Sequence, residues 1–271
     1  MEPLIKVRDL YKIFNIGTNK VYALNGVSFD IYRGEFIAIV GTSGSGKSTC
    51  LNMLAGLEAP SSGIIQIAGK RIDRMNESQL VAFRRQNVGF IFQSYNLIPS
   101  MNALENVSMP LMFRGVPLET RTKAAKHYMK LIGIGDQGLH MPNQMSGGQQ
   151  QRVGIARALV IDPKIIFADE PTGNLDSHTT DDVLNLLKKI VEEEHRTLVM
   201  VTHDPHIASW ADRQLRVVDG HIVETVINKE SSIEQEILRE TGSEPYCVVT
   251  PENLYIIKNR GQYRKNPCGF F

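Results

Sequence analysis

The stretch FIAIVGTSGSGKST, residues 36–49, decides the fold. Its five apolar residues, Phe36 to Val40, predict a buried strand, and a helical pattern, KSTCLNMLAGL, begins at Lys47. Between them, GTSGSGKS fits the phosphate-binding pattern G-x-x-x-x-G-K-[ST], which requires a strand before it and a helix after it. Because both flanks are present, the stretch predicts a nucleotide-binding α/β protein rather than a chance glycine turn.

The segment Gly41–Thr49, which we call the phosphate loop, has the residue types that this chemistry needs. Glycines allow the backbone to turn so that successive N–H groups converge on phosphates, and the following helix adds its positive end. Lys47 is expected to reach the β- and γ-phosphates, and Ser48 to ligate Mg²⁺. The predicted nucleotide-binding residues of the loop are Gly41, Thr42, Ser43, Gly44, Ser45, Gly46, Lys47, Ser48 and Thr49.

Outward from this loop, strand and helix patterns alternate. Strand patterns are LIKVRDL and VYALNGVSFDI before the loop, and IIQIAG, VGFIF, KIIFAD, TLVMV and LRVVDG after it. Residues 94–159 contain no strand pattern, but NALENVSMPLMFRG and LETRTKAAKHYMKLIGI have helical spacing. The sequence therefore predicts a parallel α/β core with a β-rich start and an inserted helical subdomain at residues 94–159.

Composition narrows the class of protein. The chain has 271 residues, of which 42% are hydrophobic and 22% charged, as in soluble globular proteins. A formal net charge of +1 disfavours a nucleic-acid binder that relies on a basic surface. The apolar runs are far shorter than the roughly 20 residues of a membrane-spanning helix, and no secretory leader pattern opens the sequence. The three cysteines are expected to be free thiols.

The character of the sequence changes at about Lys229. SSIEQEILRE could form a short amphipathic helix, and YCVVT and NLYIIKN a hairpin. We therefore expect a nucleotide-binding domain at residues 1–228 and a C-terminal extension at residues 229–271, which is either a weakly ordered tail or a small contact surface.

Polar residues follow three of the predicted strands. Asp169 and Glu170 end KIIFADE, at the carboxyl edge where α/β sheets place their ligands. Asp169 is expected to hold Mg²⁺, and Glu170 to accept a proton from the attacking water. Gln93 follows VGFIF and is expected to reach Mg²⁺ or the water, while His203 follows TLVMV and is expected to contact the γ-phosphate.

A second glycine loop, MSGGQ, occupies Met145–Gln149, and we call it the signature loop. It precedes QQRVGIARALV, so it lies at a helix N-terminus, with Ser146 as the candidate cap. One chain already has a complete phosphate loop, so this second loop requires a separate explanation.

The motifs together resemble the ATPase subunit of ABC transporters over residues 4 to about 227. They occur in the order of that family: the phosphate loop, Gln93, MSGGQ, FADE ending at Glu170, GNLD at 173–176, and His203. The resemblance implies a P-loop NTPase (RecA-like) core with an N-terminal antiparallel β-subdomain and an inserted α-helical subdomain. A P-loop kinase would share GKST but would not need SGGQ. ABC ATPases that act on ribosomes or DNA typically carry two ATPase halves.

In this family two ATPase subunits meet head to tail, which would explain the second loop. Ser146, Gly147, Gly148 and Gln149 of one chain would cap the γ-phosphate that Lys47 of the other chain holds. The resemblance also places Phe14 against adenine, although Phe14 could instead be a core residue of the opening sheet. Met145 replaces the usual leucine, which conserves volume.

GNLD, with EPTGNLDS around it, and YNLIPSMNALENVSMPL further resemble the MacB, LolD and FtsE subgroup. This implies an ATP- and Mg²⁺-dependent homodimeric motor on the inner face of the cell membrane, bound to a permease that determines the transported molecule. Export and lipoprotein or peptide handling are both compatible with this subgroup. The alternative is an FtsE-like regulatory ATPase that gates a membrane partner without transport.

Overall fold

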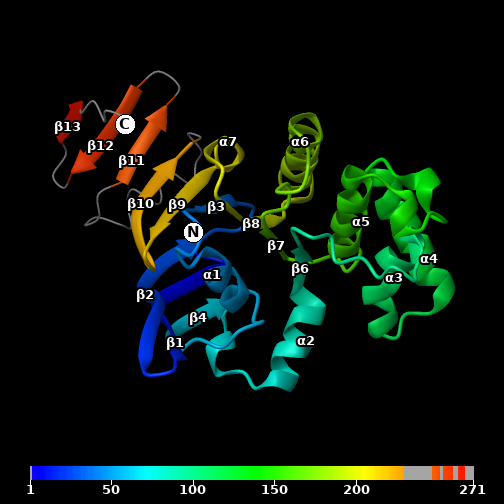
Figure 1. Cartoon of the computed structure of the whole chain (residues 1–271), viewed down its shortest axis with the longest axis horizontal. Helices are drawn as coiled ribbons and strands as arrows, with labels where there is room; N and C mark the ends of the chain where they lie inside the picture. The colour runs from blue at the N-terminus through cyan, green and yellow to red at the C-terminus, as the bar shows by residue number, and fades with distance from the viewer. Residues whose placement is uncertain (1, 229–245, 251–252, 259–261, 266–271) are drawn as a thin grey trace. The chain divides into compact units, whose positions relative to one another are not determined.

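The computed structural model describes residues 2–228, 246–250, 253–258 and 262–265. The chain divides into two compact units, one formed by residues 1–74 and 201–271 and the other by residues 75–200. Strand β8, Thr197–Thr202, contains the boundary between them. Figure 1 labels the elements of both units.

The first unit contains a four-stranded antiparallel sheet of order β2-β1-β4-β5. Its strands are β1 (Ile5–Ile16), β2 (Asn19–Ile31), β4 (Ser62–Ile67) and β5 (Lys70–Arg71), followed by the 3₁₀ turn η1 (Ile72–Arg74). β1 runs beyond the predicted LIKVRDL, because its second half pairs with β2 as far as the turn at Gly17, whose φ is 60°. The expected N-terminal antiparallel β-subdomain is confirmed.

The same unit holds the strand that leads into the phosphate loop. β3 (Phe36–Val40) is almost fully buried and pairs in parallel with β9 (Arg213–Val218), which pairs antiparallel with β10 (His221–Ile227). The helices are α1 (Lys47–Leu54) and α7 (Pro205–Ala208). α1 ends before the predicted Leu57, since Gly56 takes a left-handed conformation (φ 67°) that terminates helices.

Three further strands, β11 (Tyr246–Thr250), β12 (Asn253–Lys258) and β13 (Gln262–Lys265), follow in this unit. β11 pairs in parallel with β10 at Val226 and Ile227, and antiparallel with β12. The expected hairpin of YCVVT and NLYIIKN is therefore present. The expected helix SSIEQEILRE lies outside the described residues.

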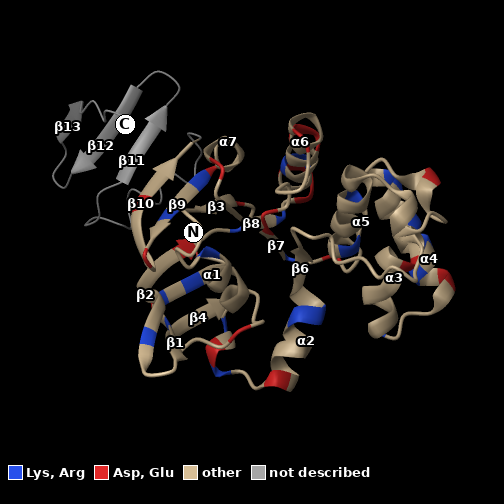
Figure 2. Cartoon of the chain, viewed as in Figure 1, with Lys and Arg blue, Asp and Glu red and all other residues tan. Residues whose placement is uncertain are grey.

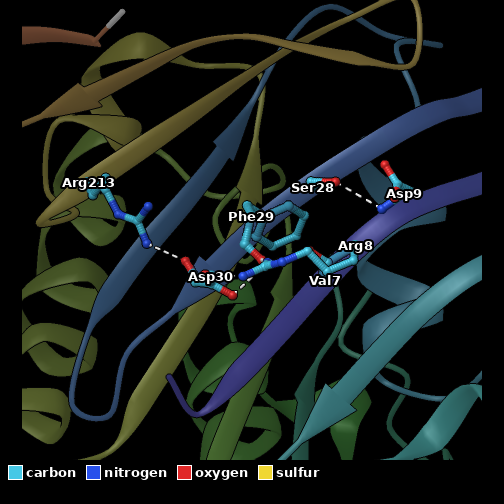
Figure 3. A network of polar contacts seen from close by, with 7 residues as sticks. All are labelled: Val7, Arg8, Asp9, Ser28, Phe29, Asp30 and Arg213. Atoms are coloured by element: carbon cyan, nitrogen blue, oxygen red, sulfur yellow. Dashed lines mark hydrogen bonds and ion pairs between the residues drawn. The ribbon is translucent and has the colours of Figure 1, made fainter. Parts of the chain in front are cut away.

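A polar network ties the antiparallel sheet to β9 (Figure 3). Arg8 forms a bidentate ion pair with Asp30 at 2.8 and 2.6 Å. The Arg213 guanidinium donates to the Asp30 carbonyl (2.7 Å) and to Glu35 Oε1 (2.6 Å). Glu35 is 1% exposed and Arg213 is 6% exposed, so each charge is buried with its partner. Because a buried charge without its partner costs several kcal/mol, this pair favours one alignment of the two sheets.

The second unit combines a pair of parallel strands with helices. Its elements are α2 (Glu77–Asn87), β6 (Val88–Ile91), α3 (Ala103–Phe113), α4 (Leu118–Leu131), η2 (Gly135–Gln137), η3 (Pro142–Gln144), α5 (Gly147–Leu159), β7 (Ile165–Asp169) and α6 (Ser177–Glu194). β6 pairs with β7 in parallel, from Val88 with Ile165 to Ile91 with Ala168. Residues 94–159, which are described throughout, contain no strand, as the sequence predicts.

Capping residues fix where these helices begin. Asn76, Asn102 and Ser146 each form a capping box at the start of α2, α3 and α5. In such a box the cap side chain accepts from the third helical N–H, and the third side chain accepts from the cap N–H. Asp176 caps α6 through the Thr179 N–H at 2.9 Å. Local sequence therefore determines these four helix starts.

Charge is mixed over the described residues. Figure 2 shows basic and acidic residues on both units, and on α2 they lie at opposite ends of the helix, with Glu77 in the first turn and Arg84 and Arg85 in the last. Among the described residues, no helix is both long enough and apolar enough to cross a membrane.

Candidate nucleotide site

The two invariant glycines of the phosphate pattern are required by neighbouring backbone. A Cβ on Gly41 would lie 2.2 Å from the Val217 carbonyl oxygen, and one on Gly46 would lie 2.1 Å from the Ala23 carbonyl oxygen. Gly46 also has a φ of 103°, which L-residues rarely adopt. Only glycine therefore fits at both positions, and the loop is held tightly against its own unit.

Polar groups of the phosphate loop are arranged for an anion. Lys47, the first residue of α1, is 5% exposed, and its Nζ donates to the Thr42 carbonyl at 2.7 Å. The Ser45 hydroxyl oxygen is buried and has no hydrogen-bond partner within the described residues. A buried ammonium, an unsatisfied hydroxyl and a glycine cradle at a helix N-terminus fit the phosphates of a nucleotide.

Two other predicted residues also lie in this first unit. Phe14, on β1 opposite Val21, is 37% exposed, and Lys12 Nζ lies 5.0 Å from its ring centroid. Phe14 is therefore not part of the core, and its ring remains available for stacking. His203 follows β8 in an exposed bend.

Behind the phosphate loop, Cys50 is buried on α1. Desolvation raises the pKa of its thiol to about 12, so it is protonated at neutral pH. The expectation of a free thiol holds for this residue, and burial makes it unreactive.

In the second unit, the structure brings Gln93 and Glu170 together. The parallel pairing of β6 with β7 places Gln93, which follows β6, and Asp169, the last residue of β7, at the same edge of the strand pair. A Cβ on Gly173 would lie 2.8 Å from Gln93 Nε2 and 3.4 Å from Glu170 Oε2, so both side chains converge on Gly173. Asn174 Nδ2 donates to the Gln93 carbonyl at 3.0 Å. This edge thus gathers two carboxylates and an amide.

The signature loop opens α5. Ser146 is exposed, accepts from the Gln149 N–H at 3.3 Å, and donates its own N–H to Gln149 Oε1 at 2.8 Å. Gly147 and Gly148 form the first turn of the helix, and their N–H groups have no intrahelical partner. The loop therefore presents free backbone donors and no cation.

Helix α5 also holds two other loops of the site through side chains that sequence reasoning missed. Gln151, which is fully buried, donates to the Pro171 carbonyl beside Glu170. Arg157, 8% exposed, donates to the Tyr95 carbonyl at 2.7 Å and the Asn96 carbonyl at 2.6 Å, just after Gln93. Gln151 and Arg157 lie on the apolar face of the predicted helix, where a buried polar side chain needs a hydrogen-bond partner. This pattern in the sequence could have indicated their structural role.

Comparison with known proteins decides the family. A family profile described as ABC transporter matches residues 24–173. An uncharacterized ABC transporter ATP-binding protein of Thermotoga maritima is 47% identical over 222 residues, which cover 82% of this chain and 94% of that protein. The chain belongs to the ABC transporter ATP-binding family. It is therefore an ATP-binding ATPase, and its P-loop fold is confirmed.

Two further relatives of this ABC ATPase bear on its assembly. The macrolide export ATP-binding/permease protein MacB of Hyphomonas neptunium is 44% identical over 233 residues. The matched region covers 86% of this chain and 36% of that protein. The ABC ATPase thus covers about a third of the length of the MacB relatives that it matches. A dimeric post-hydrolysis structure of the ATP-binding cassette MJ0796 bound to ADP and Pi has a TM-score of 0.78 at 41% identity, covering 84% of this chain and all of that one.

Proposed function

We propose that this ABC ATPase is a transporter motor of the MacB/LolD type that dimerises head to tail around two ATP molecules and drives a membrane permease. The observation that carries the proposal is the N-terminus of α5 at the exposed Ser146. There the Gly147 and Gly148 N–H groups are donors, and the loop contains no cation. Such a loop suits a γ-phosphate that another chain already holds. The names of the MacB relatives, which join ATP-binding and permease, and the dimers of MJ0796 support it.

The proposal assigns regions as follows. Residues 1–228 form the ATPase domain, residues 94–159 its helical subdomain that passes motion to the permease, and residues 229–271 an extension without an assigned role. The permease holds the ATPase at the inner face of the membrane. Export and lipoprotein or peptide handling are both consistent with this assignment.

Binding roles follow from the geometry of each residue. The backbone of Gly41–Thr49 and the Lys47 ammonium bind the phosphates, and the exposed ring of Phe14 stacks on adenine. Side-chain oxygens of Ser48, Asp169 and Gln93 are hard donors that suit Mg²⁺, which usually completes its shell with water and substrate phosphates. When bound, Mg²⁺ supplies positive charge to the β- and γ-phosphates.

Hydrolysis requires water to attack the γ-phosphorus while the bond to the β-phosphate oxygen breaks, giving ADP and phosphate. Glu170 accepts the proton of that water, and Gln93, which converges with Glu170 on Gly173, orients it. His203 donates to the γ-phosphate. The N–H groups of Gly147 and Gly148 and the side chains of Ser146 and Gln149, all from the second chain, donate to the γ-phosphate oxygens and stabilise the charge that develops there.

The proposal is tested by trapping the dimer. Glu170→Gln keeps the size of the side chain but removes the base, which typically contributes about 10²–10⁴-fold to the rate. Size-exclusion chromatography is expected to show a dimer with ATP and a monomer with ADP, because ADP lacks the γ-phosphate. Adding Ser146→Arg should abolish the dimer, whereas Ser78→Arg, at an exposed serine in the first turn of α2, should not.

The controls separate assembly from binding. Fluorescent ATP analogues should bind the Glu170→Gln/Ser146→Arg chain as they bind the Glu170→Gln chain, because the phosphate loop is unchanged. A double variant that still dimerises with ATP would refute the head-to-tail arrangement.

A further inference from the structure

The loop after Gln93 has an unusual backbone. Tyr95 and Asn96 have φ values of 57° and 47°, so two consecutive non-glycine residues lie in the left-handed region. A non-glycine residue in this region is strained, and the conformation persists only where its surroundings hold it. Here Arg157 of α5 donates to both of their carbonyls, which fixes the turn.

This turn directs Tyr95 at the signature loop. A Cβ on Gly147 would lie 2.9 Å from the Tyr95 hydroxyl oxygen and 3.8 Å from the carbon that carries it. Partial desolvation raises the pKa of the Tyr95 phenol. The backbone carbonyl oxygen of Tyr95 lies 3.8 Å from the position that a Cβ on Gly154 would take. Tyr95 therefore packs along the first turns of α5, and its hydroxyl takes the space that a side chain at residue 147 would need.

The other signature glycine has a different neighbour. A Cβ on Gly148 would lie 2.5 Å from the Thr179 methyl carbon Cγ2, while Thr179 Cβ and Oγ1 would stay at 3.8 and 3.9 Å. Thr179 is held in place because its N–H and hydroxyl both donate to the Asp176 carboxylate, at 2.9 and 2.7 Å. The signature loop thus lies between a side chain of the Gln93 loop and one of α6, all within residues 75–200.

We propose that Tyr95 is a positioning residue for hydrolysis: held by Arg157, its hydroxyl lies against Gly147 and sets where the Ser146 loop is presented to the second chain's ATP. The proposal rests on the trans role of Ser146 given above. It implies that a shift of the loop after Gln93 moves the signature loop of the same chain. A methyl group at residue 147 would then displace the Tyr95 hydroxyl or the signature loop, and one at residue 148 would meet the Thr179 methyl group.

Paired variants test this. Gly147→Ala is expected to lower kcat about tenfold, because the new methyl group overpacks against the Tyr95 hydroxyl and displaces the loop. Tyr95→Phe removes only the hydroxyl and so relieves the clash. The kcat of the double variant Gly147→Ala/Tyr95→Phe should therefore recover to within about threefold of the kcat of Tyr95→Phe alone, since substitutions at neighbouring residues are not strictly additive. ATP affinity of the isolated chain should stay constant, since its phosphate loop is untouched.

Thr179→Ser supplies the matched control. It removes the methyl group near Gly148 and keeps the hydroxyl that donates to Asp176, so it should rescue Gly148→Ala. The crossed pairs, Gly147→Ala with Thr179→Ser and Gly148→Ala with Tyr95→Phe, should remain impaired. Recovery confined to the matched pairs is the expected result.

Two outcomes would count against different claims. If Tyr95→Phe fails to restore kcat to Gly147→Ala, or if Thr179→Ser restores it equally well, the positioning role of Tyr95 is overturned, whereas the role of Ser146 stands. If Gly147→Ala lowers the melting temperature and Tyr95→Phe restores it while kcat never changes, the packing is correct but the proposed function of the signature loop fails, and the positioning role fails with it.

Discussion

The two glycine loops of this chain both begin a helix, yet they are built differently. The phosphate loop is fixed by backbone: the Cβ positions of Gly41 and Gly46 meet carbonyl oxygens at 2.2 and 2.1 Å. The signature loop is limited by side chains, the Tyr95 hydroxyl and the Thr179 methyl. The first loop also has a buried lysine and the second has no cation at all.

This difference separates two tasks that one glycine pattern can serve. The phosphate loop has a rigid cradle and its own positive charge, so it can hold a polyphosphate without help. The signature loop offers only backbone donors and a serine, so it can complete a site but cannot form one. Side-chain neighbours also let its position depend on other loops, which a backbone-fixed cradle does not allow.

Removing the cation should have the largest effect. Lys47→Ala deletes a buried charge at the proposed phosphate position, and loss of such a charge-stabilising group typically costs about 10²–10³-fold in rate. We expect ATPase to fall by at least that amount. Lys70→Ala, at an exposed lysine of β5 in the same unit, is the control and should retain wild-type ATPase. Near-normal turnover by Lys47→Ala would remove the distinction between the two loops.

Backbone fixation makes a second prediction. Gly41→Ala should lower the free energy of unfolding by more than about 3 kcal/mol, since the new methyl group overlaps a carbonyl that no side-chain change can move. Gly44→Ala should cost only about 1–2 kcal/mol, the strain of its left-handed backbone, because nothing lies within 4 Å of its Cβ position. Urea denaturation measures both. Equal losses would mean that the cradle is not held by its neighbours.

Loss of adenine stacking should change nucleotide affinity by a smaller amount. The residue concerned, Phe14, lies in the same unit as the phosphate loop. Phe14→Ala should weaken ATP and GTP binding by about 1–3 kcal/mol alike, since every purine has a face on which an aromatic ring stacks. Val21→Ala, opposite Phe14 on β2, tests whether the hairpin itself is responsible. Unchanged affinity in Phe14→Ala would move the platform elsewhere, Tyr11 being the next aromatic on β1.

Burial of Cys50, the residue that follows the phosphate loop, should make the free energy of unfolding depend on pH. The Cys50 pKa is raised from 9.0 to about 12, so the unfolded thiol ionises first and the stability contributed by burial is lost between those values. At pH 10 the difference in unfolding free energy between wild type and Cys50→Ala should be smaller than at pH 8 by about 1.4 kcal/mol, one pKa unit. A pH-independent difference would show that the thiol is not desolvated.

Much of this structure could be predicted from local sequence. GTSGSGKS between an apolar run and a helix predicts the cradle, and Asn76, Asn102 and Ser146 mark helix starts, because these signals act within a few residues. The reasons for the glycines could not be predicted. Gly41 depends on Val217, and Gly147 depends on Tyr95, and such pairings between distant residues are set by the fold.

The most direct test of the central claim, that two chains share each ATP, is a mixing experiment. Lys47→Ala leaves its chain with a working signature loop, and Ser146→Arg leaves its chain with a working phosphate loop, so neither variant alone can form a complete site. In a head-to-tail heterodimer one of the two sites is complete, so equal mixing should restore ATPase, up to about half of the wild-type rate if all chains pair as heterodimers. If the mixture is as inactive as its components, although both variants fold and Ser146→Arg binds ATP, the account is contradicted.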